Sequence, residues 1–277
     1  MSDIDQPRRP GPWDIKPEVQ SAAPPAPARV SLDKGQSPLW MIVSTILLGG
    51  PIYWVTNSWV IAVAAVWGLF VHEYGHVLAM NRLGMGPAKI YIIPFLGGVA
   101  RSQRLPQSEW HGVLVSLAGP AFGLLAAIPF FAAFMVTGQG QWLQGVFAIA
   151  LINLVNLAPA PPLDGSKALG PVLARIHPMV ERVAMIAVGV LVVWWGVTNG
   201  SFIFAAFLVL ALIGHLRRGA WRPEGRTLTW GEAGKSVGLF LVTAAACVAV
   251  LLAGLLPVSS GLEEAVALGR GYFGFGA

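Results

Sequence analysis

Long apolar segments recur along most of this chain of 277 residues. A helix needs about 20 apolar residues to cross the hydrocarbon core of a membrane, and the candidates are 39–56, 58–81, 112–136, 142–158, 183–198, 201–216 and 236–256. Only 11% of the residues are charged, about half the usual fraction in soluble domains. The sequence therefore predicts an all-α, polytopic membrane protein. It predicts six to seven transmembrane helices, because the two short apolar segments after Pro178 can be counted in two ways.

Lysine and arginine mark one side of the predicted membrane. They precede the first span, follow the second and the fourth, and precede the last, whereas the connections near 57, 137–141 and 199–200 contain neither. Cytoplasmic loops carry an excess of these residues, so the pattern places the N-terminus and every basic loop in the cytoplasm. These loops also account for the net charge of +5, and nucleic-acid binding is therefore not expected.

Three ionisable residues, His72, Glu73 and His76, interrupt the second apolar segment in the stretch FVHEYGHVLAM. Such side chains are costly inside a membrane and are usually functional there. A separation of four residues places both imidazoles on one face of a helix, where they can share a metal ion. Glu73 can then reach a water on that metal, and this H-E-x-x-H pattern is typical of zinc hydrolases. Counted from Ser58, the motif lies ~21 Å along the span, near its cytoplasmic end.

A catalytic zinc site needs a third protein ligand and an open position for water. Asp164 is the only aspartate after Asp33, and it lies in the stretch NLVNLAPAPPLDGSKAL. The predicted orientation brings this stretch to the cytoplasmic depth of His76. Prolines break the helix there, and irregular backbone at membrane depth is tolerated only inside protein or beside a wet cavity. Asp164 is therefore the candidate third ligand.

The stretch HEYGH followed by NLAPAPPLDG resembles the site-2 protease family of intramembrane zinc metalloproteases. The resemblance implies that His72, His76 and Asp164 bind one Zn2+ per chain. It implies that Glu73 is the catalytic glutamate. It also implies that Asn156, eight residues before Asp164, holds the substrate or stabilises the transition state.

Two glycine-containing stretches extend this resemblance. IPFLGGVAR is similar to an extended loop that approaches the active site in relatives, so Gly97 and Gly98 are candidate substrate-binding positions. SLAGPAFG is similar to a segment of the third core helix, but Gly119 and Gly123 are interpreted as ordinary small-residue packing between helices. Asn153 has no counterpart in the family pattern and is interpreted as a packing or helix-to-helix polar contact.

These features divide the chain into five parts. Residues 1–37 predict a disordered cytoplasmic tail, 38–57 the first transmembrane helix, 58–170 the catalytic membrane core, 171–256 additional transmembrane helices, and 257–277 a C-terminal tail. The core is expected to contain three central helices and a short extended Gly-Gly loop after the H-E-x-x-H helix.

The activity implied by the resemblance is hydrolysis of a peptide bond within or near a transmembrane segment. Besides the lipid bilayer, the expected partner is a single-span membrane protein, cleaved by regulated intramembrane proteolysis in a bacterial cytoplasmic membrane, with the active-site end cytoplasmic. The alternative is a metal or ion transporter that binds its cation through the His and Asp side chains, although such a protein has no need of Glu73. The oligomeric state, the cleavage site and the activating signal stay open.

Overall fold

The structure, a computed structural model, describes residues 35–94, 97–198, 205–206, 208–210, 212–214 and 225–272. The predicted disordered tail lies outside the described residues except at 35–37, and parts of the predicted span 201–216 lie outside them too. The described residues are mostly helical, with one small two-stranded sheet. The all-α class is thus confirmed, while the number of spans stays a prediction.

The helices follow the apolar segments of the sequence in order. They are α1 (Pro38–Thr56), α2 (Trp59–Arg82), α3 (Glu109–Gly123), the 3-10 turn η1 (Leu124–Ala127), α4 (Ile128–Thr137), α5 (Gln141–Asn156), α6 (Asp164–Ile176), α7 (Pro178–Thr198), α9 (Trp230–Ala253), the 3-10 turn η2 (Leu256–Val258) and α10 (Leu262–Gly271). Strands β1 (Lys89–Ile93) and β2 (Gly97–Arg101) form an antiparallel hairpin between α2 and α3.

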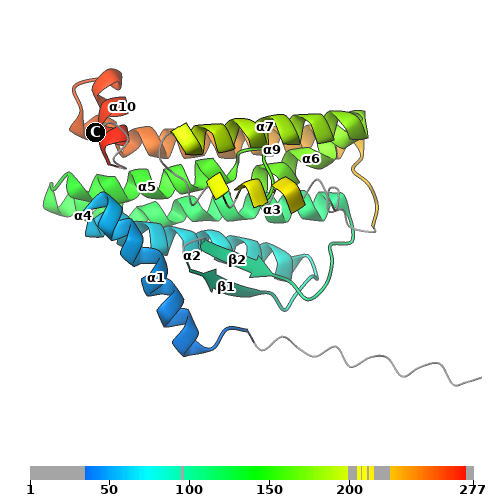
Figure 1. Cartoon of the computed structure of the whole chain (residues 1–277), viewed down its shortest axis with the longest axis horizontal. Helices are drawn as coiled ribbons and strands as arrows, with labels where there is room; N and C mark the ends of the chain where they lie inside the picture. Colours follow the sequence, from blue (N-terminus) through cyan, green and yellow to red (C-terminus); the bar gives the residue numbers. More distant parts are fainter. Residues whose placement is uncertain are drawn as a thin grey trace, which may run out of the picture. The chain divides into compact units, whose positions relative to one another are not determined.

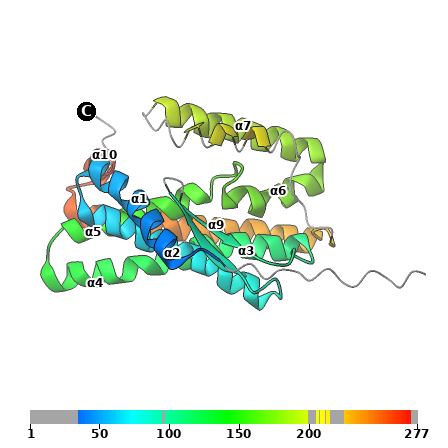
Figure 2. The ribbon, with the colours of Figure 1, turned by 60° about the horizontal axis from the view of Figure 1, so that its bottom comes forward.

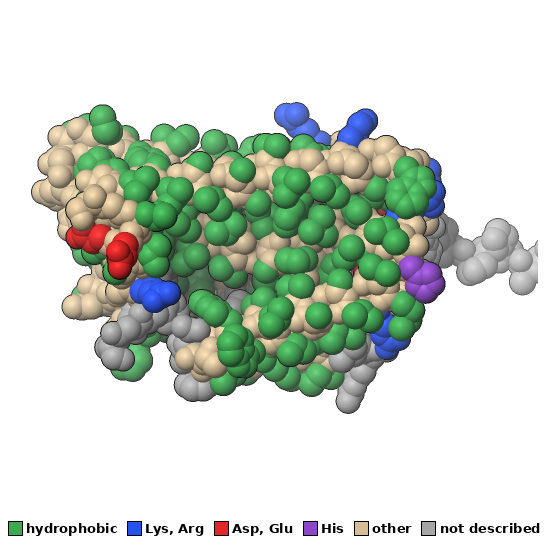
Figure 3. All heavy atoms as spheres, turned by 90° about the horizontal axis from the view of Figure 1, so that it is seen from above, with side chains coloured by type: hydrophobic (Ala, Val, Ile, Leu, Met, Phe, Trp, Pro, Cys, Tyr) green, Lys and Arg blue, Asp and Glu red, His purple; other side chains and the backbone are tan. Residues whose placement is uncertain are grey.

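Within the described ranges, five helical stretches are long and apolar enough to cross a membrane: Pro38–Thr56, Trp59–Arg82, Glu109–Thr137, Pro178–Thr198 and Trp230–Val258. The helix α5 is also apolar but has only 16 residues. Hydrophobic side chains cover most of the face shown in Figure 3, and the few charged ones visible lie at its margins. Exposed apolar surface on this scale needs a non-aqueous environment, so the chain is a multi-pass membrane protein.

Polar side chains fix where several helices begin. The hydroxyl of Ser58 accepts a hydrogen bond from the backbone N–H of Ile61 at the start of α2, and Ser108 caps α3 in the same way. Thr229 and Glu232 form a capping box at the start of α9. These caps place the starts of α3 and α9 earlier than the apolar segments alone predict.

The helix α2 lies at the centre of the fold, in contact with α1, α3, α5 and the hairpin. Figure 1 shows α2, α3 and α5 side by side, with the hairpin next to α2. A hydrophobic cluster joins α2, η1, α4 and α5, with Ala64, Ala127, Phe130 and Ile149 among its members. Figure 2 shows α7 running along α6, on the side away from α2. The functional motif therefore lies on the helix with the most neighbours.

Candidate metal centre and active site

The central helix α2 carries His72, Glu73 and His76 into the protein interior. Their exposed fractions are only 2%, 6% and 6%. The spacing of four residues places the two imidazoles on one face, and their Nε2 atoms lie 3.1 Å apart. A ligand atom of Glu73 lies within 4.8 Å of those of both histidines. The three side chains thus form one buried cluster.

Asp164 reaches this cluster from a different part of the chain. The helix α5 ends at Asn156, the proline-rich stretch 157–163 follows, and α6 begins at Asp164. Gly165 makes this turn possible, because a β-carbon there would overlap the backbone carbonyl of Leu157. The Oδ2 atom of Asp164 lies 3.1 Å from His72 Nε2 and 3.2 Å from His76 Nε2. The structure therefore brings all three predicted ligands together.

In each imidazole, Nδ1 points away from the cluster and Nε2 faces it. The hydrogen bond made by Nδ1 determines whether Nε2 is free to bind a metal ion. His76 Nδ1 lies 2.7 Å from the backbone carbonyl of Val115, which can only accept, so Nδ1 donates. His72 Nδ1 lies 2.9 Å from Asn153 Oδ1, and Asn153 Nδ2 in turn donates to the carbonyl of Ile149. In the neutral imidazoles both Nε2 atoms then carry lone pairs. Two lone pairs and a carboxylate oxygen thus face one another, an arrangement that a shared metal ion would stabilise.

The spacing of these three atoms fits a small metal ion. Ligands about 2.0–2.1 Å from one tetrahedral ion lie about 3.3 Å from each other, close to the observed separations of 3.1 to 3.2 Å. Gly119 of α3 leaves the space beside them open, because a β-carbon there would overlap the His76 imidazole and lie 2.8 Å from His72 Nε2. Two imidazoles and one carboxylate are also a donor set typical of catalytic zinc. The residues present therefore fit the ion.

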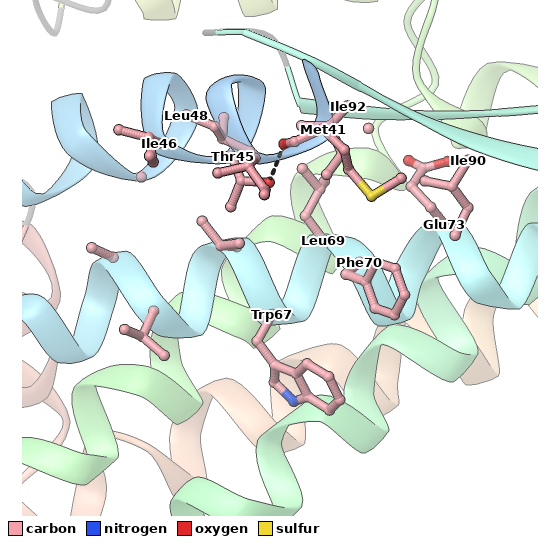
Figure 4. A pocket seen from close by; sticks show the side chains of 16 residues that line it. Met41, Thr45, Ile46, Leu48, Trp67, Leu69, Phe70, Glu73, Ile90 and Ile92 are labelled. Carbon is pink, nitrogen blue, oxygen red and sulfur yellow. Dashed lines mark hydrogen bonds between the residues drawn. The ribbon is translucent and has the colours of Figure 1, made fainter. Parts of the chain in front are cut away.

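An apolar pocket of about 610 Å3 leads to Glu73. Side chains of α1, α2 and β1 line it, among them Met41, Phe70 and Ile92. Figure 4 shows Glu73 at one end of this pocket, beside Ile90 of β1. Thr45 and Glu73 are the polar side chains of its lining, which is otherwise apolar.

The predicted Gly-Gly pair lies at the start of β2. Gly97 has a φ of 120°, which favours glycine, and pairs with Ile93 of β1. Gly98 lines the pocket and lies against Glu73, because a β-carbon there would be 3.1 Å from the Glu73 carboxyl carbon and closer still to Cγ. The pair is thus extended and close to the site, and its role toward substrate stays a prediction.

The two asparagines of α5 have different places. Asn156 is half-buried and donates from Nδ2 to the carbonyl of Ile152, one turn back in its own helix. No hydrogen bond joins it to His72, His76 or Asp164 in the described part of the chain. Asn153 is fully buried and does contact the cluster, through His72. Its interpretation as a helix-to-helix polar contact therefore needs one addition, that the partner is a candidate ligand.

Comparison with known proteins gives independent information on the helix that carries His72, Glu73 and His76. The model of peptidase family M50 matches residues 60–150, which include the H-E-x-x-H helix and both glycine stretches. The matched residues are thus similar to this family, known as the site-2 protease family. The suggested family resemblance is thereby confirmed.

Two relatives extend the similarity. A zinc metalloprotease of Methanocaldococcus jannaschii is 28% identical over 145 residues, which are 50% of this chain and 40% of that protein. A protein of Synechocystis, provisionally named as a zinc metalloprotease, is 28% identical over 162 residues, 52% of this chain and 41% of that protein. The matched segments thus span about two fifths of the length of these relatives.

Three contributors to the candidate site were not predicted from the sequence. The carbonyl of Val115 orients His76, and no side-chain pattern encodes a backbone carbonyl. Gly119 faces the two imidazoles, where the sequence suggested only helix packing. Lys167 places Nζ 3.5 Å from Asp164 Oδ1, and its position three residues after Asp164 is the signal that could have revealed it.

Proposed function

We propose that this chain is a zinc metalloprotease that hydrolyses a peptide bond within or near a transmembrane segment of a membrane protein. One observation carries the proposal: three buried acceptor atoms of His72, His76 and Asp164 converge on one point, with the carboxylate of Glu73 beside them. The names of the two M50 relatives support the choice of zinc and of proteolysis.

Each side chain receives a definite role in this proposal. His72, His76 and Asp164 hold the ion. When bound, zinc acidifies a water and polarises the scissile carbonyl. Glu73 takes a proton from the attacking water and passes it to the amide nitrogen as the C–N bond breaks. The products are a carboxylic acid and an amine, so no further reactant is needed.

Asn156 is proposed to bind the substrate. Its Nδ2 can hold the substrate carbonyl or the developing oxyanion once it turns away from the carbonyl of Ile152. The reorientation is local, because Asn156 is the last residue of α5 and the proline-rich stretch follows it.

The shape of the pocket supports a single-span membrane protein as substrate. Its walls between α1, α2 and β1 are almost wholly apolar, which suits a transmembrane segment and disfavours a hydrated cation path. A helical substrate hides its amides, so the segment must unwind before attack. An extended substrate stretch can then lie beside Gly97 and Gly98, where no side chain prevents close approach of two backbones.

We further propose that the active-site end faces the cytoplasm of a bacterium and that cleavage belongs to regulated intramembrane proteolysis. Ser108 and Arg226 form a β-bridge, so the segments before α3 and α9 lie together. Both segments are basic, and basic segments stay in the cytoplasm.

The test is a comparison of purified wild type, Glu73→Gln and Asp164→Asn with candidate single-span proteins. We expect one zinc per chain and cleavage in wild type, zinc without cleavage in Glu73→Gln, and loss of both in Asp164→Asn. Equal cleavage by wild type and Glu73→Gln would contradict the proposal. Zinc flux into proteoliposomes, unaffected by Glu73→Gln, would favour the transporter alternative instead.

A further inference from the structure

A fully buried amide of α5 controls the orientation of His72. Asn153 Oδ1 lies 2.9 Å from His72 Nδ1, and Asn153 Nδ2 donates to the carbonyl of Ile149 at 2.8 Å. A carbonyl only accepts, so the bond to Ile149 decides which end of the amide faces the imidazole. Asn153 therefore presents an acceptor, and His72 must carry its proton on Nδ1.

The amide occupies space that α3 leaves open. A β-carbon at Gly123 would overlap Asn153 Oδ1 and would lie 2.7 Å from Cγ. The helix α3 ends at Gly123 and tightens into the 3-10 turn η1 from Leu124 onward. A side chain at position 123 would thus force the Asn153 amide out of its observed place beside His72.

We propose that Asn153 is a positioning residue of the metal site and that Gly123 acts through it. Asn153 holds His72 with Nε2 toward His76 and Asp164. In the described part of the chain, Asn153 is the only side chain that bonds the Nδ1 atom of either histidine, because His76 uses the backbone of Val115. Metal affinity therefore depends on one replaceable side chain. This inference rests on the proposed zinc site.

An ordinary packing role makes a different prediction. If Asn153 only filled space between α2, α3 and α5, an apolar side chain of similar volume would serve equally well. If it positions His72, the acceptor atom is what matters. Loss of such an outer partner typically lowers metal affinity 10- to 100-fold.

The experiment measures zinc affinity of the purified full chain by competition with a chromophoric chelator. We expect Asn153→Leu to bind zinc about 10- to 100-fold more weakly than wild type, and Asn153→Asp, which keeps an acceptor, to recover most of the loss. Thr243→Val is a matched control, because the Thr243 hydroxyl donates to the carbonyl of Leu239 in its own helix, and among the described residues it bonds no group of the site. The cobalt-substituted proteins report whether the ligand geometry changes.

The role of Gly123 is tested by a double-mutant cycle. We expect Gly123→Ala to weaken zinc binding, and Gly123→Ala with Asn153→Ala to be no weaker than Asn153→Ala alone. Gly112→Ala, in the same helix α3 as Gly123, is the control, because a β-carbon there meets no other atom within 4 Å. Additive losses in the double variant would show that Gly123 acts independently.

Failure of this inference is distinct from failure of the proposed function. Zinc affinity of Asn153→Leu within twofold of wild type, in a folded protein, would overturn the positioning role and leave the protease intact. If Asn153→Leu does not fold, the zinc affinities of Asn153→Asp and Gly123→Ala decide instead. The positioning role is contradicted if both variants bind zinc as tightly as wild type. A zinc-loaded wild type without any cleavage would instead count against the protease alone.

Discussion

Gly98 of β2 lies directly against the side chain of Glu73 of α2, with no room for a β-carbon between them. Strand β2 thus covers the group that is proposed to move protons, and Gly98 also lines the pocket. The hairpin and the H-E-x-x-H helix are therefore in direct contact at the site, although of these two elements only the helix carries its ionisable groups.

Replacing Gly98 with alanine should displace Glu73 and leave the metal ligands in place. We expect Gly98→Ala to lower the rate of cleavage by about tenfold or more, because small displacements of a reacting group are costly. Zinc content should stay at the wild-type level. Gly112→Ala is the control, since a β-carbon there meets no other atom within 4 Å. Loss of zinc together with activity would show that the hairpin supports the ligands themselves.

Gln36 connects the start of α1 to the outer edge of β1. Its Nε2 donates to the carbonyl of Ile92 at 2.7 Å, and its Oε1 accepts from the N–H of Ile92 at 2.8 Å. Each such bond contributes about 1 kcal/mol. We expect Gln36→Ala to speed hydrogen exchange at Ile92 several-fold, as measured by mass spectrometry of the β1 peptide. In Gln36→Glu, which keeps the acceptor, exchange at Ile92 should be faster than in wild type and slower than in Gln36→Ala. Unchanged exchange in Gln36→Ala would contradict the contact.

Removal of zinc should weaken the junction between α5 and α6. Without a cation, the Nε2 atoms of His72 and His76 and the carboxylate of Asp164 present only acceptors to one another. We expect a chelator to lower the melting temperature and to speed proteolysis within 157–163. Added Zn2+ should reverse both effects, whereas Mg2+ should not, because it prefers oxygen ligands. The size of the shift depends on free zinc, so it is measured at fixed concentration.

Some of this site could be predicted because it depends on spacing alone. Four residues between two histidines fix a common helix face, and a lone aspartate in a proline-broken segment leaves few alternatives for a third ligand. In contrast, the hydrogen-bond partners of Nδ1 in His72 and His76 depend on how the helices pack against each other. Asn153 and Asn156 lie one turn apart, and only the packing of α5 against α2 decides which of them reaches His72.

The helices likewise divide into those that apolar length predicts and those that it does not. Apolar length predicted the positions of α1 and α2 within one or two residues, since both are long apolar segments. The helix α6 was not predicted, because its mixture of glycine, proline and polar residues has no long apolar run. The start of α9 at Trp230 depends on the capping box of Thr229 and Glu232, which precedes the apolar run from 236. Local hydrogen bonding, and not hydropathy, sets such boundaries.

The position of Asp164 at the beginning of α6 has a consequence for biosynthesis. A ribosome delivers His72 and His76 to the membrane some ninety residues before the carboxylate that completes their site. The nascent chain therefore passes through a period in which α2, α3 and α5 are already made but two of the three candidate metal ligands still lack the third.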